Sequence, residues 1–193
     1  MTELTGLLHE LEEQWRRHHL PIVDKLKPGL EATEVRQRLQ SVGLAAPSEI
    51  IEWYGWHDGA EPQGRMAPLF DTLTLAKCLE LYVLNVRAKM QDPLETPGLL
   101  PVMVSGRGEC VVVDARDENS EVVVVALQGR ELDLAPPEYH LPSLATLIGW
   151  WVELFKSDAW SAHPDFEHDI KSNLSTADRA RYPQIAVEQG FVI

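Results

Sequence analysis

One short segment, residues 47–59, constrains the fold more than any other part of this 193-residue chain. It reads Pro-Ser-Glu-Ile-Ile-Glu-Trp-Tyr-Gly-Trp-His-Asp-Gly, and its apolar residues recur at the spacing of one helical face. The leading proline suits a first helical turn, where its missing N–H costs no hydrogen bond, and the closing glycine would stop the helix by adopting positive φ. We therefore expect a short helix that buries Trp53 and Tyr54, followed by a turn that His57 and Asp58 serve.

Four other stretches show the helical period in their apolar residues. In the first stretch, Glu12 and Arg16 form an i, i+4 pair on the opposite side. Gly43 follows the second stretch as a C-terminal cap, and Ser143 precedes the last as an N-cap. The inward-facing residues are Leu4, Leu7, Leu8, Leu11 and Trp15, then Val35, Leu39 and Val42, then Leu75, Leu79, Tyr82, Val83 and Val86, and finally Leu144, Leu147, Ile148, Trp151 and Phe155.

From residue 99 the apolar period changes from helical to extended. Three short runs rich in β-branched residues follow, at 99–104, 110–114 and 122–127, and turn residues separate them. They predict three consecutive antiparallel strands joined by hairpins. The third run is apolar without alternation, as expected when both faces of a strand are covered, so we place it at the centre of the sheet.

The order of these elements predicts an α+β fold: a single domain in which an antiparallel β-sheet of about four to six strands is flanked by helices. We assign residues 1–157 to this domain. Residues 158–193 would form a C-terminal extension docked on it, with a short helix opening at Ser175 or Thr176. The apolar residues available for docking are Phe166, Ile170, Leu174, Ile185 and Val187.

The chain is acidic, with a formal net charge of −13. Its first 45 residues hold seven acidic and six basic side chains, so nearly all of the excess follows Ala45. Phosphate binding needs clustered Lys and Arg, so we expect no direct binding of nucleic acid and favour a basic protein partner. No apolar run approaches the ~20 residues that span a bilayer, and no secretory signal is visible, so we expect no membrane partner and a cytoplasmic location.

Few residues offer a reaction centre. Cys78 and Cys110 are too few and too far apart for a disulfide framework or a zinc pair, so we expect buried free thiols. Residues 163–169 have the composition of a metal site, but His163 and His168 lie five apart across a proline, unlike the i, i+4 pair of a helical zinc motif. We expect no metal and no cofactor. The nucleophile-elbow and phosphate-loop motifs of common enzymes are also missing from the sequence.

Five features in this order resemble the SUKH superfamily. They are an N-terminal helix bearing a Trp, the helix that ends Trp-Tyr-Gly-Trp-His-Asp-Gly, a Leu-Pro-Val strand, a Val-Val-Asp strand and a Ser-Leu helix with Trp150-Trp151. The extension lies outside the resemblance, and Ala45-Ala46-Pro47 stands where family members often have Leu-Pro. The family includes fungal cell-wall assembly regulators and many bacterial immunity proteins. Its fold is an α+β sheet flanked by helices, and its signature contains no catalytic residues.

The resemblance implies a non-catalytic protein-binding module, and in many bacterial members an immunity protein that neutralises a toxin, often a nuclease. An acidic surface could occupy a basic groove that normally holds phosphate. The alternatives are a regulatory adaptor and a hydrolase whose site is assembled from distant carboxylates and histidines. For the acidic loop after residue 113, a solvated turn is the alternative to a partner contact. The candidate partner-binding residues are Asp58, Glu61, Asp114, Asp117, Glu118 and Glu121.

Overall fold

The computed structural model confirms the α+β class. It describes residues 2–60, 64–68, 70–89, 98–106, 110–117, 122–128, 131–134, 140–166 and 169–182 of the 193. Every helix predicted from the apolar period is present, and so is the short helix of the extension. The helices are α1 (Glu3–Arg17), α2 (Ala32–Gln40), α3 (Ser48–Trp56), α4 (Leu75–Lys89), α5 (Leu144–Lys156) and α6 (Thr176–Arg181), with a 3-10 turn η1 (Pro21–Lys25).

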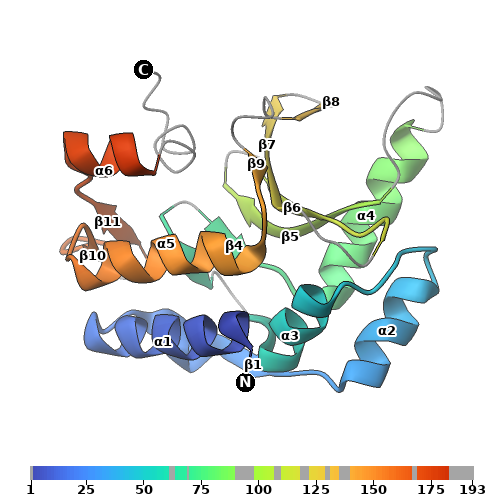
Figure 1. Ribbon diagram of the computed structural model, residues 1–193, viewed down its shortest axis with the longest axis horizontal. Coiled ribbons are helices and arrows are strands. Elements are labelled where there is room, and N and C mark those ends of the chain that lie inside the picture. The colour runs from blue at the N-terminus through green and yellow to red at the C-terminus, as the bar shows by residue number, and fades with distance from the viewer. Residues whose placement is uncertain are drawn as a thin grey trace.

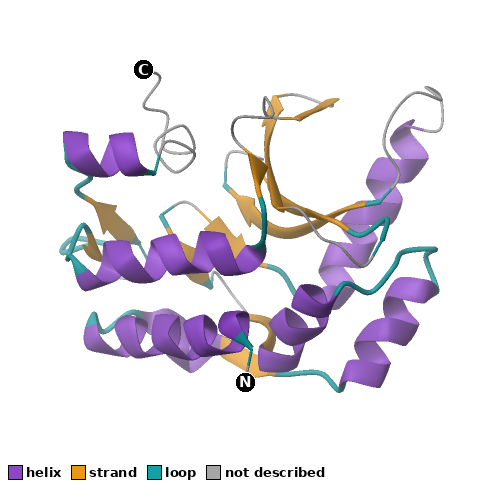
Figure 2. Ribbon diagram, in the orientation of Figure 1, coloured by secondary structure: helices purple, strands orange, loops and turns teal. Residues whose placement is uncertain are grey.

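Helices α1 and α5 lie side by side and run in the same direction (Figure 1). The predicted inner face of α1 is buried at Leu4, Leu8, Leu11 and Trp15, whereas Leu7 is partly buried. Trp15 ends this face, and its indole N–H donates to the carbonyl oxygen of Met66 at 3.2 Å. Helix α3 packs on α1 and α2 packs on α3, and the longest strands of the sheet lie above this group of helices (Figure 2).

In the part of the chain that the structure describes, the main sheet has seven antiparallel strands in the order β3-β4-β5-β6-β7-β8, with β9 also paired to β7. The three strands predicted from the sequence are confirmed as β5, β6 and β7, and β7 is internal. The expected four to six strands were too few, because β3, β4 and β9 are too short to show an alternating pattern. The strands are β3 (Arg65–Ala67), β4 (Phe70–Thr72), β5 (Leu99–Ser105), β6 (Cys110–Asp114), β7 (Val122–Gln128), β8 (Glu131–Leu134) and β9 (His140–Leu141).

Strand β6 is buried on both faces. Val111 and Val113 join the main core, whereas Cys110 and Val112 face the other way and pack with Leu99. The sheet therefore separates one large core from a smaller apolar cluster. Both cysteines of the chain are buried thiols that form no disulfide, as the sequence predicts.

Helix α3 passes directly into β2 (His57–Ala60), which pairs with β1 (Leu26–Pro28). Pro47 occupies the position before the first helical residue, and the rings of Trp53 and Tyr54 are buried as expected. The aromatic segment therefore belongs to the core.

Gly59 does not end α3, contrary to the sequence-based expectation, because the helix has already stopped at Trp56. It has the expected positive φ, +68°, but it lies within β2. A Cβ at this position would lie 2.6 Å from the carbonyl carbon of Leu73 and from the amide nitrogen of Thr74. Glycine is required here both by φ and by the close approach of this neighbouring backbone.

The extension docks on α5 through aromatic contacts. It contains the antiparallel hairpin of β10 (Trp160–Ala162) and β11 (Ile170–Ser172), followed by α6. Trp160 is buried, with its ring centroid 6.2 Å from that of Trp151 and 5.5 Å from that of Phe155. Ser175 caps α6 in a reciprocal capping box.

Phe166 does not dock, which corrects one sequence expectation. Ile170 and Leu174 are buried, but the Phe166 side chain is 62% exposed. Ala162 pairs with Ile170, so Phe166 lies in the turn beyond the last paired residues of the hairpin and points away from the core. Ile185 and Val187, the other expected docking residues, lie outside the described residues.

We expect Gly59→Ala to destabilise the chain by more than its backbone angle alone explains. Positive φ costs an ordinary residue ~1–2 kcal/mol, and forcing a methyl against the backbone at Leu73 should add ~1–3 kcal/mol. Gly43→Ala is the matched control, since Gly43 has φ of +80° with nothing within 4 Å of an added Cβ. Urea unfolding would measure both variants, and equal losses would contradict the steric argument.

Candidate functional site

Three carboxylates from the segment of α3 and β2 bind the starts of other helices. Glu49 accepts hydrogen bonds from the backbone N–H groups of Leu144 and Ala145, at 2.8 and 3.1 Å. These groups begin α5 and have no partner inside that helix. Ser143 completes the cap by accepting the N–H of Thr146 at 3.0 Å. The negative charge of Glu49 also interacts favourably with the dipole of α5.

Asp58, the first candidate partner-binding residue, has the same role at α4. Its Oδ1 accepts the N–H of Leu75, the first residue of α4, at 2.7 Å. Thr74 accepts the N–H of Lys77 at 3.2 Å and completes that cap. Asp58 is half-buried, and its carboxylate serves the start of the next helix rather than the turn after its own.

Glu52 is the third carboxylate, and it contacts the start of α1. Its Oε2 accepts hydrogen bonds from the hydroxyl groups of Thr2 and Thr5. Thr2 in turn caps α1 by accepting the N–H of Thr5. Helices α1, α4 and α5 therefore all begin against residues 49–58.

His57 and Glu12 join this same segment to α1. The imidazole Nδ1 lies 2.8 Å from the carbonyl oxygen of Lys27, to which it must donate. The Nε2 atom lies 3.5 Å from Oε2 of Glu12, which also accepts the indole N–H of Trp56 at 3.3 Å. Both ring nitrogens thus face protein oxygens, so this geometry suits a structural link better than a catalytic base.

Asp114 lies at the end of β6, where its carboxylate binds Arg116. The guanidinium Nε donates to both carboxylate oxygens at 2.8 Å, and the backbone N–H of Arg116 donates to Oδ1 at 3.0 Å. The side-chain hydrogen bonds from Arg116 hold the pKa of Asp114 below its ordinary value. The acidic loop therefore begins with a compensated charge.

Three of the six candidate acids lie among the described residues, and their contacts differ. Asp58 is bound at α4 and Asp114 is bound to Arg116, while Asp117 is exposed at the start of the loop. Glu61, Glu118 and Glu121, the remaining candidates, lie outside the described residues.

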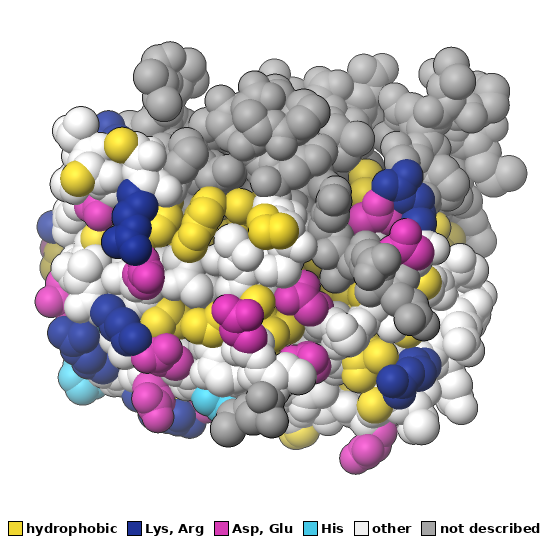
Figure 3. Space-filling view, viewed as in Figure 1, with side chains coloured by type: hydrophobic (Ala, Val, Ile, Leu, Met, Phe, Trp, Pro, Cys, Tyr) yellow, Lys and Arg dark blue, Asp and Glu magenta, His cyan; other side chains and the backbone are white. Residues whose placement is uncertain are grey.

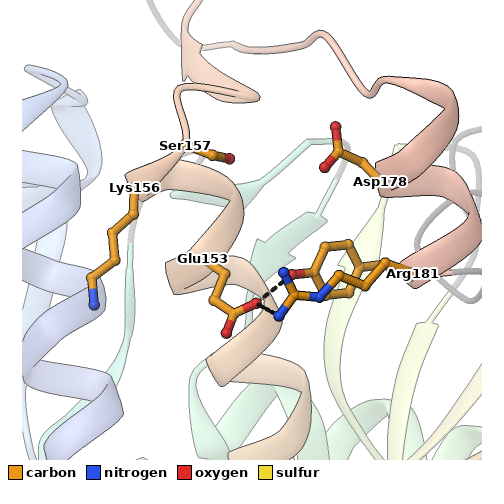
Figure 4. Close-up of a pocket in the computed structure, with 6 residues that line it drawn as sticks. Glu153, Lys156, Ser157, Asp178 and Arg181 are labelled. Atoms are coloured by element: carbon orange, nitrogen blue, oxygen red, sulfur yellow. Dashed lines mark hydrogen bonds and ion pairs between the residues drawn. The ribbon is translucent and has the colours of Figure 1, made fainter.

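A cavity of about 360 Å³ lies between α5 and α6 (Figure 4). Glu153 at its wall accepts hydrogen bonds from Arg181, at 2.8 Å, and from the Tyr182 hydroxyl. Burial, followed by the hydrogen bond to Glu153, raises the pKa of Tyr182 to about 12. Hydrogen bonds from Ser175 lower the pKa of Asp178, while Lys156 points away toward Glu10. The charged groups around the cavity are therefore already paired within the protein.

A second cavity, of about 470 Å³, opens where α1 ends. It contains none of the candidate residues, and its lining mixes apolar groups with one acidic and two basic or imidazole side chains. The lining residues are Arg16, His19, Leu20, Pro21, Val23 and Asp24.

Within the described ranges, no group of three or more His, Cys, Asp or Glu side chains is arranged to hold a metal ion. His163 instead accepts the N–H of Asp165 at 3.1 Å, and His168 lies outside those ranges. Burial raises the pKa of Cys78 to about 12, so its nucleophilic thiolate form is suppressed at neutral pH. Among the helical segments that the structure describes, none is long and apolar enough to cross a membrane.

The sequence interpretation missed the roles of Glu49 and Glu52. Their i, i+3 spacing on α3 indicates that they share one side of the helix. That signal could have marked them as a pair, but the helix starts that they contact lie far away in the sequence. Glu12 was recognised only as the partner of Arg16.

We expect Asp58→Ala to lower the free energy of unfolding by about 0.5–2 kcal/mol, the usual effect of losing a helix cap. Asp58→Asn is the matched control, because its amide oxygen can still accept the N–H of Leu75. Urea unfolding should place the Asn variant between the wild-type chain and the Ala variant. An Ala variant as stable as wild type would show that the cap is dispensable.

We also expect Tyr182 to weaken the fold at high pH. Its pKa of about 12 in the folded chain exceeds the unfolded value of about 10. Its stabilising effect is therefore complete below pH ~10 and is lost as pH rises through ~12. Unfolding measured at several pH values across this window should show a steeper decline for the wild-type chain than for Tyr182→Phe. Identical slopes would contradict the assignment.

Two comparisons with known proteins give no assignment. No protein-family model matches the chain, and a search of curated proteins finds no match. A functional proposal therefore rests on the residues, the geometry and the resemblance described above.

Proposed function

We propose that this chain is a non-catalytic protein-binding module, an immunity protein that neutralises a basic toxin domain by occluding its active site. The elements that carry the SUKH resemblance support the proposal, since they occur in the same order as α1, α3, β5, β6 and α5. The segment that most specifies the resemblance also organises the helices, through Glu49, Glu52 and Asp58. A scaffold role for that segment would leave recognition to other surfaces.

The single observation from which we infer a basic partner is the distribution of charge. Basic side chains gather at the left of the face in Figure 3, where α1 and α5 end. They are compensated by acids within the molecule, so the net charge of −13 is available to a basic partner. The ion pairs at this end are Arg16 with Glu12, Arg17 with Asp158, and Lys156 with Glu10.

Such a partner would be captured in two steps. Long-range attraction between the acidic chain and a basic groove would raise the rate of encounter. The rigid α+β domain would then cover the groove that a nuclease uses for phosphate. Neither step requires a reacting group on this chain.

The contacts around the cavity between α5 and α6 favour binding over hydrolysis. Glu153 already accepts hydrogen bonds from Tyr182 and Arg181, and Asp178 is held by Ser175. A hydrolytic carboxylate pair would have to give up these bonds before acting. The protein-binding proposal requires no such rearrangement.

Co-expression with the toxin domain encoded beside the gene for this chain tests the proposal. Cells should survive toxin expression only when the chain is present, and the two purified proteins should form a complex. Continued killing despite soluble expression would contradict the proposed neutralisation. A toxin with its own catalytic residue replaced would allow the complex to be isolated without cell death.

We expect Asp117→Lys/Glu118→Lys to slow association with the toxin domain by about 10-fold at low salt. Asp24→Lys/Glu31→Lys is the matched control, because it changes the same formal charge at exposed acids before Ala45. Surface plasmon resonance at two salt concentrations would measure both variants. Equal slowing by the two would assign the effect to net charge and would remove the loop as a specific contact.

A further inference from the structure

One large aromatic side chain stands out from the surface of the extension. Among the described residues, the exposed large hydrophobic side chains are those of Phe166, which is 62% exposed, and Leu84, which is 51% exposed. Phe166 lies in the turn between β10 and β11, beyond the pairing of Ala162 with Ile170. An exposed aromatic ring offers a large apolar area for burial against another protein.

The hairpin holds Phe166 in this outward position. Its carbonyl oxygen accepts the N–H of Asp169 at 3.1 Å, and its ring centroid lies 4.7 Å from that of His163. The N–H of His163 donates to the carbonyl oxygen of Asp169 at 2.9 Å, which closes the turn. Because the ring already packs on His163, it loses less conformational entropy when it binds.

The turn is also anchored to the main sheet. One oxygen of Asp169 accepts hydrogen bonds from Arg65 of β3, at 3.0 Å, and from the N–H of Ile170, at 2.9 Å. Arg65 lies 3.5 Å from Asp71 of β4 as well. The ring of Phe166 is therefore presented on a support that is tied to both the sheet and the hairpin.

Charge distinguishes this position from the other exposed apolar residue. The sequence 163–169 contains no Lys or Arg, and Asp165 is exposed beside Phe166. On α4, by contrast, Glu80 lies one turn before Leu84 and pairs with Lys77 at 2.9 Å. An aromatic ring with an acidic neighbour suits an apolar pocket that is surrounded by basic groups. The surface around Leu84, where the charges cancel, suits such a pocket less well.

We propose that Phe166 is the anchor by which this chain binds its basic protein partner, inserting into an apolar socket on that partner while Asp165 faces basic groups at the rim. This inference rests on the proposed neutralising function and names a contact for it. It assigns partner recognition to the extension, which lies outside the SUKH resemblance. It therefore separates a shared scaffold from a chain-specific recognition element.

The test compares two matched pairs of variants for binding to the inactivated toxin domain encoded beside the gene. Phe166→Ala should weaken the Kd by about 30-fold or more, whereas Leu84→Ala should change it by less than about 2-fold. Asp165→Lys should slow association more than Glu80→Lys, which makes the same change in formal charge. Phe166→Trp should retain binding, because it keeps an aromatic ring at the same place.

Thermal unfolding completes the test, since Phe166 buries little area in the free chain. The Phe166→Ala variant should melt within about 2 °C of wild type. A larger loss of stability would make the ring a structural residue and overturn the inference. If wild type binds and Phe166→Ala binds equally well, the inference is overturned and the proposed function stands. No binding by wild type would overturn both.

Discussion

The start of a helix carries backbone N–H groups that the helix itself cannot satisfy, and in this fold one short segment contributes to the caps of three helices. Glu49, Glu52 and Asp58 belong to one short segment, and they contact the starts of α5, α1 and α4. Each carboxylate is both a hydrogen-bond acceptor and a negative charge. Each contact therefore supplies a hydrogen bond and a favourable interaction with the positive end of the helix dipole. The arrangement of the helices around the sheet depends on this segment more than on any other.

Because of these contacts, not every acidic side chain of this chain is available to a partner. Part of the negative charge is used inside the fold, at the helix starts and in pairs such as Asp114 with Arg116. The basic partner that we propose would therefore meet acids that the fold leaves exposed, such as Asp165. Net charge indicates the sign of the charge expected on a partner, whereas the location of the exposed acids limits where such a partner could bind.

The extension shows how a docked segment can serve two purposes. Trp160 and Tyr182 attach it to α5 through buried aromatic contacts, and Asp169 attaches it to the sheet through Arg65. With both ends fixed, the turn of the hairpin can hold Phe166 in solvent at little cost to the core. The core does not need such a feature, which is why we connect it with the proposed partner.

Local periodicity in the sequence determined the α+β class, the positions of α1 to α5, the strands β5 to β7 and the burial of Trp53 and Tyr54. It could do so because these features depend on neighbours three, four or two residues away. Only the tertiary structure decided that Asp58 caps α4, that Gly59 lies against Leu73, and that Phe166 faces solvent. The first two depend on backbone brought close from elsewhere in the chain and the third on the placement of the hairpin turn, and no local spacing in the sequence records these arrangements.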